Sequence, residues 1–307
     1  MSAILLGVDL GASKILAVAL DERGEVRARR RVQTRREEGP ERVLERVAEA
    51  AREAAAEATG TPEGLGVGCA GLVDRRRGIV LSSIMLPGWS GFPLREALSR
   101  RAGLPVEADN DANAALLGEL RARAFPRETI LGLTVGTGIG GAIAIEGALY
   151  RGALGTAGEF GNTTIAHDGP RCWCGNRGCL NALASGDAIE ARARSLSPPR
   201  EGEEPPTVRS LARAAAAGDG KAQEILRHAG ALLGAGIANL VNVFNPDRVL
   251  LSGGVAEAGG VWLEALREEV ARRALAEPAA HAKVERARLG YDAGAIGAAA
   301  LLLEERR

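Results

Sequence analysis

The sequence predicts an α/β protein made of two related halves. Short apolar strands alternate with alanine-rich helices after an opening run of strands, which is typical of α/β folds. A strand–glycine turn–strand pattern near the N-terminus recurs near residue 129, and such an internal repeat indicates two related units. With 307 residues, 46% of them hydrophobic, the chain is long enough for two domains with substantial cores.

The first half begins with three predicted strands and a helix. Apolar runs at Val8–Leu10 and Ile15–Leu20 flank a turn at Gly11, and Gly24 marks the turn into the third strand. Residues 40–59 then combine alanines with charge pairs four residues apart, a pattern that favours a helix.

Further strands and helices complete this half. We expect a buried strand at residues 65–73, a short helix at 92–101, a strand at 105–110 and a helix at 111–124 with an acidic first turn. These elements predict a first domain of residues 1–115.

The second half repeats the opening hairpin and then becomes mainly helical. The predicted order is a hairpin from Thr129, an exposed loop at 196–206, helices within 208–244, a strand at 247–254, a helix at 260–276 and a strand at 284–290. We expect residues 116–292 to form the second domain. An alanine- and leucine-rich helix should run from residue 295 to residue 307, and we assign residues 293–307 to the first domain because this helix should pack back on it.

Charge and hydropathy argue against several classes of protein. Lysine plus arginine equals aspartate plus glutamate at 39 each, so there is no basic surplus for binding nucleic acid or an anionic membrane. The N-terminal apolar stretch is broken by Asp9 and is too short for a secretion signal. No later run approaches the roughly 20 apolar residues that span a bilayer. We therefore expect a cytoplasmic protein.

Both glycine turns are candidate phosphate-binding sites. Glycine lets backbone N–H groups come close to an anion, and a neighbouring hydroxyl group adds a donor. Asp9, on the strand that leads into the first turn, is placed to hold Mg²⁺. The alternative is that these are two ordinary tight turns. The candidate residues are Gly11, Ser13 and Lys14 in the first turn and Gly136, Thr137, Gly138, Gly140 and Gly141 in the second.

The segment ADNDANAA at residues 108–115 places polar residues where a predicted strand meets a helix. Asn110 can fix a hydroxyl group and Asp111 can accept its proton, and phosphoryl transfer requires little more of protein side chains than such alignment. The alternative is that Asn110 or Asp111 only caps the helix, and the local pattern does not separate the two functions.

Three of the four cysteines lie within eight residues, in the segment CWCGNRGC. Cys172, Cys174 and Cys179 lie on a glycine-turned loop that can wrap one Zn²⁺, and a nearby histidine would complete the four ligands that zinc takes. The alternative is a set of buried free thiols.

Together these motifs resemble those of the ROK (repressor, open reading frame, kinase) family over nearly the whole chain. GVDLGASK resembles the first phosphate motif of the family and LTVGTGIGG its second, and ADNDANAA resembles its catalytic segment. GEFGN followed by CWCGNRGC is similar to its sugar-and-zinc signature, and LLSGGV is similar to its adenosine motif. The resemblance implies an actin-like ATPase (ribonuclease H-like) fold, with two domains and a cleft between them. It also implies transfer of the γ-phosphoryl group of ATP to a sugar, by analogy at the 6-hydroxyl of a hexose, and assembly as a dimer or tetramer.

The resemblance assigns roles to individual positions. Asp111 would be the general base, and Asp9 would position Mg²⁺. The residues expected to bind the acceptor are Gly71, Asn110, Glu159, Asn162 and Asn181. The residues expected to bind the nucleotide are Asp9, Gly11, Ser13, Lys14, Gly136, Thr137, Gly138, Gly253 and Gly254.

Departures from the family pattern concern the acceptor and the zinc. The family's E-x-G-H motif ends here in Asn162, a family glutamate is replaced by Asn181, and a frequent family asparagine by Met85. Each lost hydrogen bond to a hydroxyl group costs roughly 0.5–1.5 kcal/mol, so we expect an amino sugar, a modified hexose or a cyclitol to be preferred over glucose. The family's histidine also ligates zinc, and since asparagine is a poor zinc ligand we expect His167 as the fourth ligand.

Two other classes of function remain open. Transcriptional regulators of the family carry a helix-turn-helix before the first phosphate motif, and here that motif starts at about residue 7. A catalytically weak sugar-binding or scaffold protein would not need Asp9, Asp111 and both phosphate turns. The sequence therefore favours a kinase.

Overall fold

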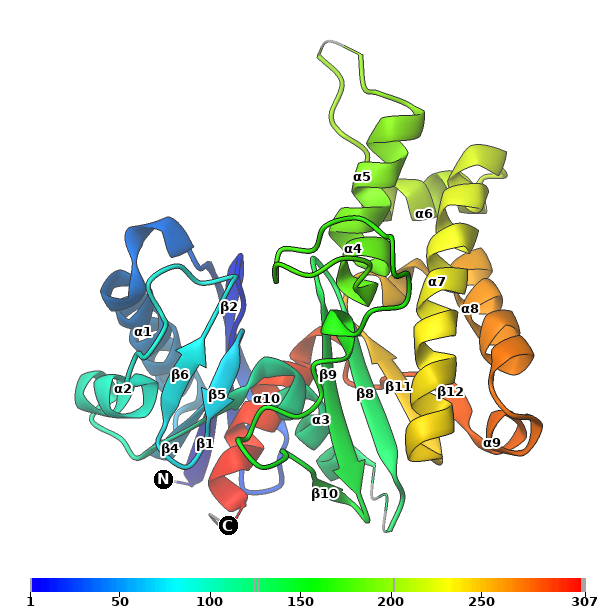
Figure 1. The fold of residues 1–307 in the computed structure, drawn as a ribbon. Coiled ribbons are helices and arrows are strands. Elements are labelled where there is room, and N and C mark those ends of the chain that lie inside the picture. The colour runs from blue at the N-terminus through cyan, green and yellow to red at the C-terminus, as the bar shows by residue number, and fades with distance from the viewer. Residues whose placement is uncertain (1, 124, 126, 201, 305–307) are drawn as a thin grey trace. The chain divides into compact units, whose positions relative to one another are not determined.

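The computed structural model describes residues 2–123, 125, 127–200 and 202–304, which form two compact units (Figure 1). Unit 1 consists of Met1–Pro126, Ala148–Ala157 and Arg288–Arg307, and unit 2 consists of Arg127–Gly147 and Gly158–Ala287. Each unit combines a sheet with helices, so the predicted α/β class is confirmed.

Unit 1 is built on a five-stranded sheet with helices on both faces. The strand order is β3-β2-β1-β4-β7, where the first three strands are antiparallel and β1, β4 and β7 run parallel. The strands are β1 (Ala3–Leu10), β2 (Lys14–Asp21), β3 (Val26–Gln33), β4 (Thr61–Cys69) and β7 (Val106–Asn110). The helices are α1 (Pro40–Ala58), α2 (Leu94–Ala102), α3 (Asp111–Ala122) and α10 (Ala293–Ala300), with 3₁₀ turns at Arg36–Glu38, Gly290–Asp292 and Leu301–Leu303.

Alternating side chains of β2 pack on both faces of this sheet. Ile15, Ala17 and Ala19 belong to the core that contains α1 and α2, whereas Leu16 and Val18 pack with the alanines of α10. Because neighbouring side chains of a strand point to opposite faces, a strand buried on both sides is apolar throughout. This explains why residues 15–20 form an unbroken apolar run.

Helix α10 packs against β1, β4 and α3 at backbone distance. A Cβ atom at Gly7 would collide with Ala295 O, one at Gly66 with Ala298 O, and one at Gly297 with Ala114 O. Only glycine allows two backbones to approach so closely. The contact with α10 keeps the whole of α3 in unit 1, whose first segment extends to Pro126.

Unit 2 contains the second five-stranded sheet, with the order β10-β9-β8-β11-β12. Its strands are β8 (Ile130–Val135), β9 (Ile139–Ile145), β11 (Arg248–Ser252) and β12 (Lys283–Arg286). The two-residue strand β10 (Ala148–Leu149) is part of this sheet, but it begins the segment Ala148–Ala157 that belongs to unit 1. Its helices are α4 (Leu180–Ala184), α5 (Gly186–Leu196), α6 (Val208–Ala216), α7 (Gly220–Phe244), α8 (Gly260–Arg273) and α9 (Ala276–His281), with 3₁₀ turns at Phe160–Asn162 and Ala256–Ala258.

Several predicted elements differ from the structure in their extent. The strand expected at 65–73 ends at Cys69, because Gly71 has a φ of +134° and starts a separate two-stranded sheet of β5 (Leu72–Asp74) and β6 (Ile79–Ser82). Helices α4, α5 and α9 were not expected. Parts of three predicted elements, at residue 124, at residue 201 and at residues 305–307, lie outside the described residues. No helix within the described ranges is long and apolar enough to cross a bilayer.

Candidate active site

Two partly buried aspartates with raised pKa values lie at one edge of the sheet of unit 1. Asp9 is near the end of β1, and Asp111 follows directly after β7 as the first residue of α3. Both strands run parallel to β4, so their carboxyl ends meet at the same edge. Burial raises the pKa of Asp9 to about 7, and the charge of Asp111 adds to this shift. Burial also raises the pKa of Asp111. Groups perturbed in this way are typical of functional sites.

The positive charge of Lys14 lowers the pKa of Asp9 and so opposes part of its upward shift. Burial lowers the pKa of Lys14, and the charges of Asp9 and Asp292 oppose that shift. Its ammonium group lies 4.7 Å from the ring centroid of Tyr291, a cation–π distance. Lys14 therefore contacts an aromatic face and feels the charges of Asp9 and Asp292.

The start of α3 is capped by Asn110. Its Oδ1 accepts hydrogen bonds from Ala112 N at 2.8 Å and Asn113 N at 3.1 Å, which are two of the N–H groups that a helix leaves unpaired. Its Nδ2 donates to Gly71 O at 2.9 Å. The side chain of Asn110 therefore caps the helix. The carboxylate of Asp111 accepts from Ala112 N at 2.9 Å and is also hydrogen-bonded to the side chain of Asn110.

The first glycine turn is closed by its own backbone. Gly11 N donates to Lys14 O at 3.0 Å, so this N–H group belongs to the hairpin and not to an anion site. Thr34, which is fully buried, fixes the turn through its Oγ1, which donates to Gly11 O at 2.7 Å, and its N–H, which donates to Ser13 O at 3.1 Å.

The second glycine turn, in unit 2, is also closed by its own backbone. Gly136 N donates to Gly138 O at 2.8 Å, two residues on, whereas Gly11 N donates to Lys14 O, three residues on. Helix α5 starts against this turn, where Gly186 N donates to Gly136 O at 2.7 Å. At the end of β11, a Cβ atom on Gly253 would lie 2.5 Å from Val135 O, and its φ of +90° also requires glycine.

Three of the predicted acceptor-binding residues form one hydrogen-bonded chain in unit 2. Asn162 Nδ2 donates to Glu159 Oε2 at 3.3 Å, and Asn162 Oδ1 accepts from Asn181 Nδ2 at 2.8 Å. Asn181 is buried, and its Oδ1 accepts from Ile139 N at 2.6 Å. The two asparagines thus connect Glu159 to the first residue of β9.

The three cysteines of the CWCGNRGC segment come together. The sulfur atoms of Cys172, Cys174 and Cys179 all lie within 4.8 Å of one another, and the last two are 3.7 Å apart. His167 does not join them. Its side chain is 97% exposed and lies next to Asp168, so the structure does not bring the expected fourth ligand to the three sulfur atoms. The exposed loop that carries His167 turns before the cysteines and leaves the imidazole in solvent.

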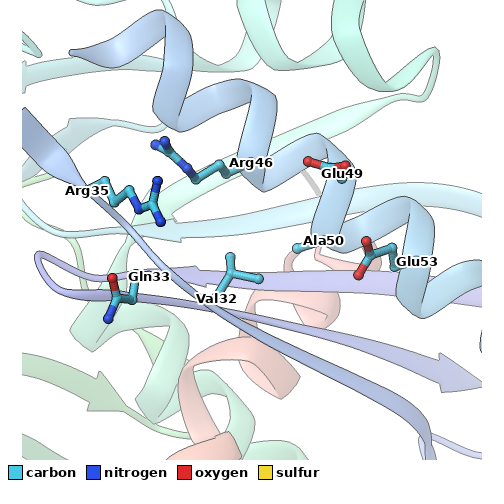
Figure 2. A pocket seen from close by; sticks show the side chains of 7 residues that line it. All are labelled: Val32, Gln33, Arg35, Arg46, Glu49, Ala50 and Glu53. Atoms are coloured by element: carbon cyan, nitrogen blue, oxygen red, sulfur yellow. The ribbon is translucent and has the colours of Figure 1, made fainter. Parts of the chain in front are cut away.

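A separate hollow lies on unit 1 between β3 and α1 (Figure 2). Arg46 donates to Thr34 O at 3.2 Å and pairs with Glu38, so it is already engaged in structural contacts. The hollow is formed by residues of β3 and α1 together with Arg35 between them, and its lining includes none of the catalytic candidates. Its lining residues are Val32, Gln33, Arg35, Arg46, Glu49, Ala50 and Glu53.

Several residues that contact the candidate site residues from other parts of the chain were not identified from the sequence. Thr34 and Tyr291 carry no motif, and each contacts the first turn from an element far along the chain. Asp109 is fully buried and ion-paired with Arg151, 42 residues away. The signal for Asp109 was present in ADNDANAA, which has a second acidic side chain two residues before Asp111, near the end of a buried strand.

Comparison with known proteins gives a consistent result. Residues 5–305 match the model of the ROK family. The solved ROK hexokinase of Thermus thermophilus is 40% identical, with a TM-score of 0.80 and 97% of each chain covered. The ROK family glucokinase of Streptomyces griseus, solved with glucose and AMPPNP, is 33% identical, with a TM-score of 0.87 over 97% of this chain and 98% of that one. The putative xylose repressor of a Caldicellulosiruptor species is 33% identical over 98% of this chain and 78% of its own length. The fold is the actin-like ATPase fold that the motifs implied.

The raised pKa of Asp9 predicts how stability depends on pH. Its pKa rises from 3.8 to about 7 on folding, so the folded protein binds the proton more tightly and metal-free protein should lose stability as pH rises from about 4 to about 7. Asp9→Asn removes this titration. We expect the free energy of unfolding of the variant, relative to the native chain, to increase between pH 4 and pH 8, by at most about 4 kcal/mol. Urea unfolding in the presence of a chelator measures it.

Asp168→Asn is the matched control for this experiment, because the Asp168 side chain is 98% exposed. Its effect on the free energy of unfolding should not vary over the same pH range. If the free energy of unfolding of Asp9→Asn, relative to the native chain, were also independent of pH, a raised pKa at Asp9 would be contradicted.

Proposed function

Because this chain belongs to the ROK family, we propose that it is an ATP-dependent carbohydrate kinase that phosphorylates a primary hydroxyl group, by analogy the 6-hydroxyl of a hexose. The observation that carries the proposal is the pair Asp9 and Asp111, two partly buried aspartates with raised pKa values at one sheet edge, beside the first glycine turn. The similarity to a hexokinase and to a glucokinase supports it. We further propose that it acts in the cytoplasm as a homodimer or homotetramer.

Asp111 is the proposed general base. Its carboxylate accepts the proton of the acceptor hydroxyl while the hydroxyl oxygen forms a bond to the γ-phosphorus of ATP. The bond from that phosphorus to the β,γ-bridging oxygen breaks, and ADP leaves. A raised pKa suits this role, because a general base is most effective when its pKa lies near the working pH. Asn110 supports the base by holding the first turn of α3.

Asp9 is the proposed group that positions Mg²⁺. The donor set fits a hard divalent cation, since a cation would offset both the burial and the nearby charge of Asp111 that raise the pKa of Asp9. Mg²⁺, when bound, would neutralise charge on the phosphate oxygens. Lys14, held over Tyr291, would add a positive charge on the same side of the first turn.

The two glycine turns are the proposed phosphate-binding elements. Gly11 N and Gly136 N close the hairpins, so the groups offered to phosphate would be those of the residues that follow in each turn, including the hydroxyls of Ser13 and Thr137. Gly138 has no side chain that would stand between the second turn and a phosphate group. Gly253 and Gly254 would let adenosine lie close to the backbone at the end of β11.

Asn110, Glu159 and Gly71 are proposed to contact the ring hydroxyls of the acceptor. Asn110 Nδ2 carries two N–H donors, and Gly71 O takes one of them. Asn162 and Asn181 hold the carboxylate of Glu159 through one hydrogen-bonded chain. Neutral amides here, in place of a histidine and a glutamate, support an acceptor other than glucose.

Asp111→Asn tests the proposed base. The amide keeps the size of the side chain but cannot accept the proton, so we expect kcat for ADP release to fall by about 10²-fold or more. The melting temperature should change little. Asp168→Asn should keep the native kcat, because this carboxylate is exposed. Near-native turnover of Asp111→Asn would refute the assignment.

The altered amide pair predicts the acceptor preference. Among glucose, mannose, glucosamine, N-acetylated amino sugars, 3-amino-3-deoxyglucose and cyclitols, we expect the highest kcat/KM for a modified acceptor, by at least about 10-fold over glucose, as two or more altered hydrogen bonds permit. The Asn162→His, Asn181→Glu double variant should move the preference toward glucose. The hypothesis fails if the native chain prefers glucose.

We propose that Cys172, Cys174 and Cys179 bind a structural Zn²⁺. In a tetrahedral site with Zn–S bonds of about 2.3 Å, sulfur atoms lie about 3.8 Å apart, and the 3.7 Å between Cys174 and Cys179 fits that geometry. The metal would hold the loop next to the turn that presents Glu159, since Thr164 bridges to Cys179. His167 is not among the groups that lie together with these sulfur atoms.

Metal content tests the zinc site. Protein purified under reducing conditions without chelator should contain about one zinc per chain, and Cys174→Ala should lose most of it because three ligands become two. His167→Ala should retain it, which separates the cysteine cluster from the exposed histidine. Native protein without stoichiometric zinc would contradict the proposal.

A sugar-responsive regulatory protein is the second candidate, favoured by the similarity to a xylose repressor. A catalytically weak sugar-binding protein would behave in the same way in the turnover assay. Measurable sugar and ATP binding without Asp111-dependent ADP release would support these functions over a kinase.

A further inference from the structure

Asp109 is a buried carboxylate that the catalytic scheme does not use. It lies one residue before Asn110 at the end of β7, and none of its surface is exposed. Its Oδ1 accepts hydrogen bonds from Asn110 N at 2.7 Å and from Asn113 Nδ2 at 3.0 Å. Both donors belong to the junction between β7 and α3. The carboxylate therefore fixes the residues on either side of Asp111.

Arg151 provides the countercharge for Asp109. Its Nε donates to Asp109 Oδ2 at 2.7 Å, and its Nη2 donates to Glu304 Oε2 at 2.6 Å. The same oxygen of Glu304 accepts from Arg75 Nη1 at 2.7 Å. All four side chains are 17% exposed or less, so the network is weakly screened by solvent. It contains two positive and two negative charges, and Arg151 is the member of it that contacts Asp109.

This geometry connects Arg151 to the catalytic candidates through Asp109. The side chain of Asn110 caps α3, and the backbone N–H of the same residue donates to Asp109. Asn113, in the first turn of α3, is held by the same oxygen. Asp111 lies between these two anchors, so its position follows from theirs.

We propose that Arg151 is a positioning residue for the phosphoryl-transfer reaction, acting through Asp109 on Asn110 and Asp111. The inference rests on the proposed kinase function. A buried ion pair that loses one partner leaves a charge without compensation, which is far more disruptive than losing both. Without Arg151, the Asp109 carboxylate must find water or move, and the junction of β7 and α3 moves with it. Catalytic groups displaced by about 1 Å can lose about 10²-fold in rate.

The test compares Arg151→Ala with Arg75→Ala. Arg75 contacts Glu304 in the same network, without contacting Asp109, so it reports loss of network stability alone. With rates measured well below each melting temperature, we expect Arg151→Ala to lower kcat for ADP release by 10- to 100-fold while KM for MgATP changes less than about 3-fold. Arg75→Ala should keep kcat within about 3-fold. Arg151→Lys should restore part of kcat, since one ammonium can still pair with Asp109.

A second measurement is independent of turnover. Hydrogen exchange of the amides of Asn110, Ala112 and Asn113 should quicken at least about 10-fold in Arg151→Ala and stay native-like in Arg75→Ala. If Arg151→Ala does not fold, Asp109→Asn replaces it, because the amide keeps an acceptor for Asn110 N and removes the ion pair. Equal losses of kcat for the alanine variants at Arg151 and Arg75, with unchanged exchange at the three amides, would overturn the inference. Absence of Asp111-dependent turnover in the native chain would refute the kinase instead, and the exchange measurement would then decide the positioning role alone.

Discussion

The architecture of unit 1 depends on the close contact of α10 with β1, β4 and α3. Glycines at the contact points let the backbones approach to a distance at which any Cβ atom would collide. A Cβ atom at Gly294 would also lie 3.0 Å from the Asp9 carboxyl carbon, so the helix that organises the sheet also limits the space beside the site. Larger residues at these positions would force α3 away from the sheet edge and separate Asp111 from Asp9.

The three aspartates at this edge have different functions because they have different neighbours. Asp109 is held by Arg151 and by two N–H donors, so burial of its charge is compensated. Asp9 and Asp111 are desolvated beside each other, and the pKa values of both are raised. A fold gains nothing in stability from such a pair, which is why two neighbouring acids of this kind indicate binding of a cation or a proton. The ion-paired carboxylate of Asp109 thus holds the junction of β7 and α3, whereas the carboxylates of Asp9 and Asp111 have no such cation within the described part of the chain and keep raised pKa values.

The sequence predicted what depends on local pattern. The apolar run of β2 and the alanine-rich α1 follow from periodicity and helix propensity, and both appear in the structure. The polar residues of ADNDANAA indicated the site, although capping and catalysis could not be assigned separately. The structure shows that Asn110 is a cap, because its side chain accepts from two N–H groups of the first turn of α3. Contacts that depend on tertiary structure were not accessible from the sequence. The pairing of Arg151 with Asp109 spans 42 residues, the break at Gly71 depends on a positive φ, and the exposure of His167 depends on the path of its loop.

The substitutions at Asn162 and Asn181 need a different interpretation from the one that sequence alone suggests. Taken as separate positions, they count as two lost contacts to an acceptor. In the structure they donate and accept along one chain from Ile139 N to Glu159, and residues in one hydrogen-bond network do not contribute additively. The amide pair satisfies its own polar groups, so it costs unit 2 little stability, and its effect falls on the orientation and charge of Glu159. A histidine and a glutamate would carry charge into the same chain. Each asparagine is the other's hydrogen-bond partner, so a change of either residue also alters the contact that reaches Glu159.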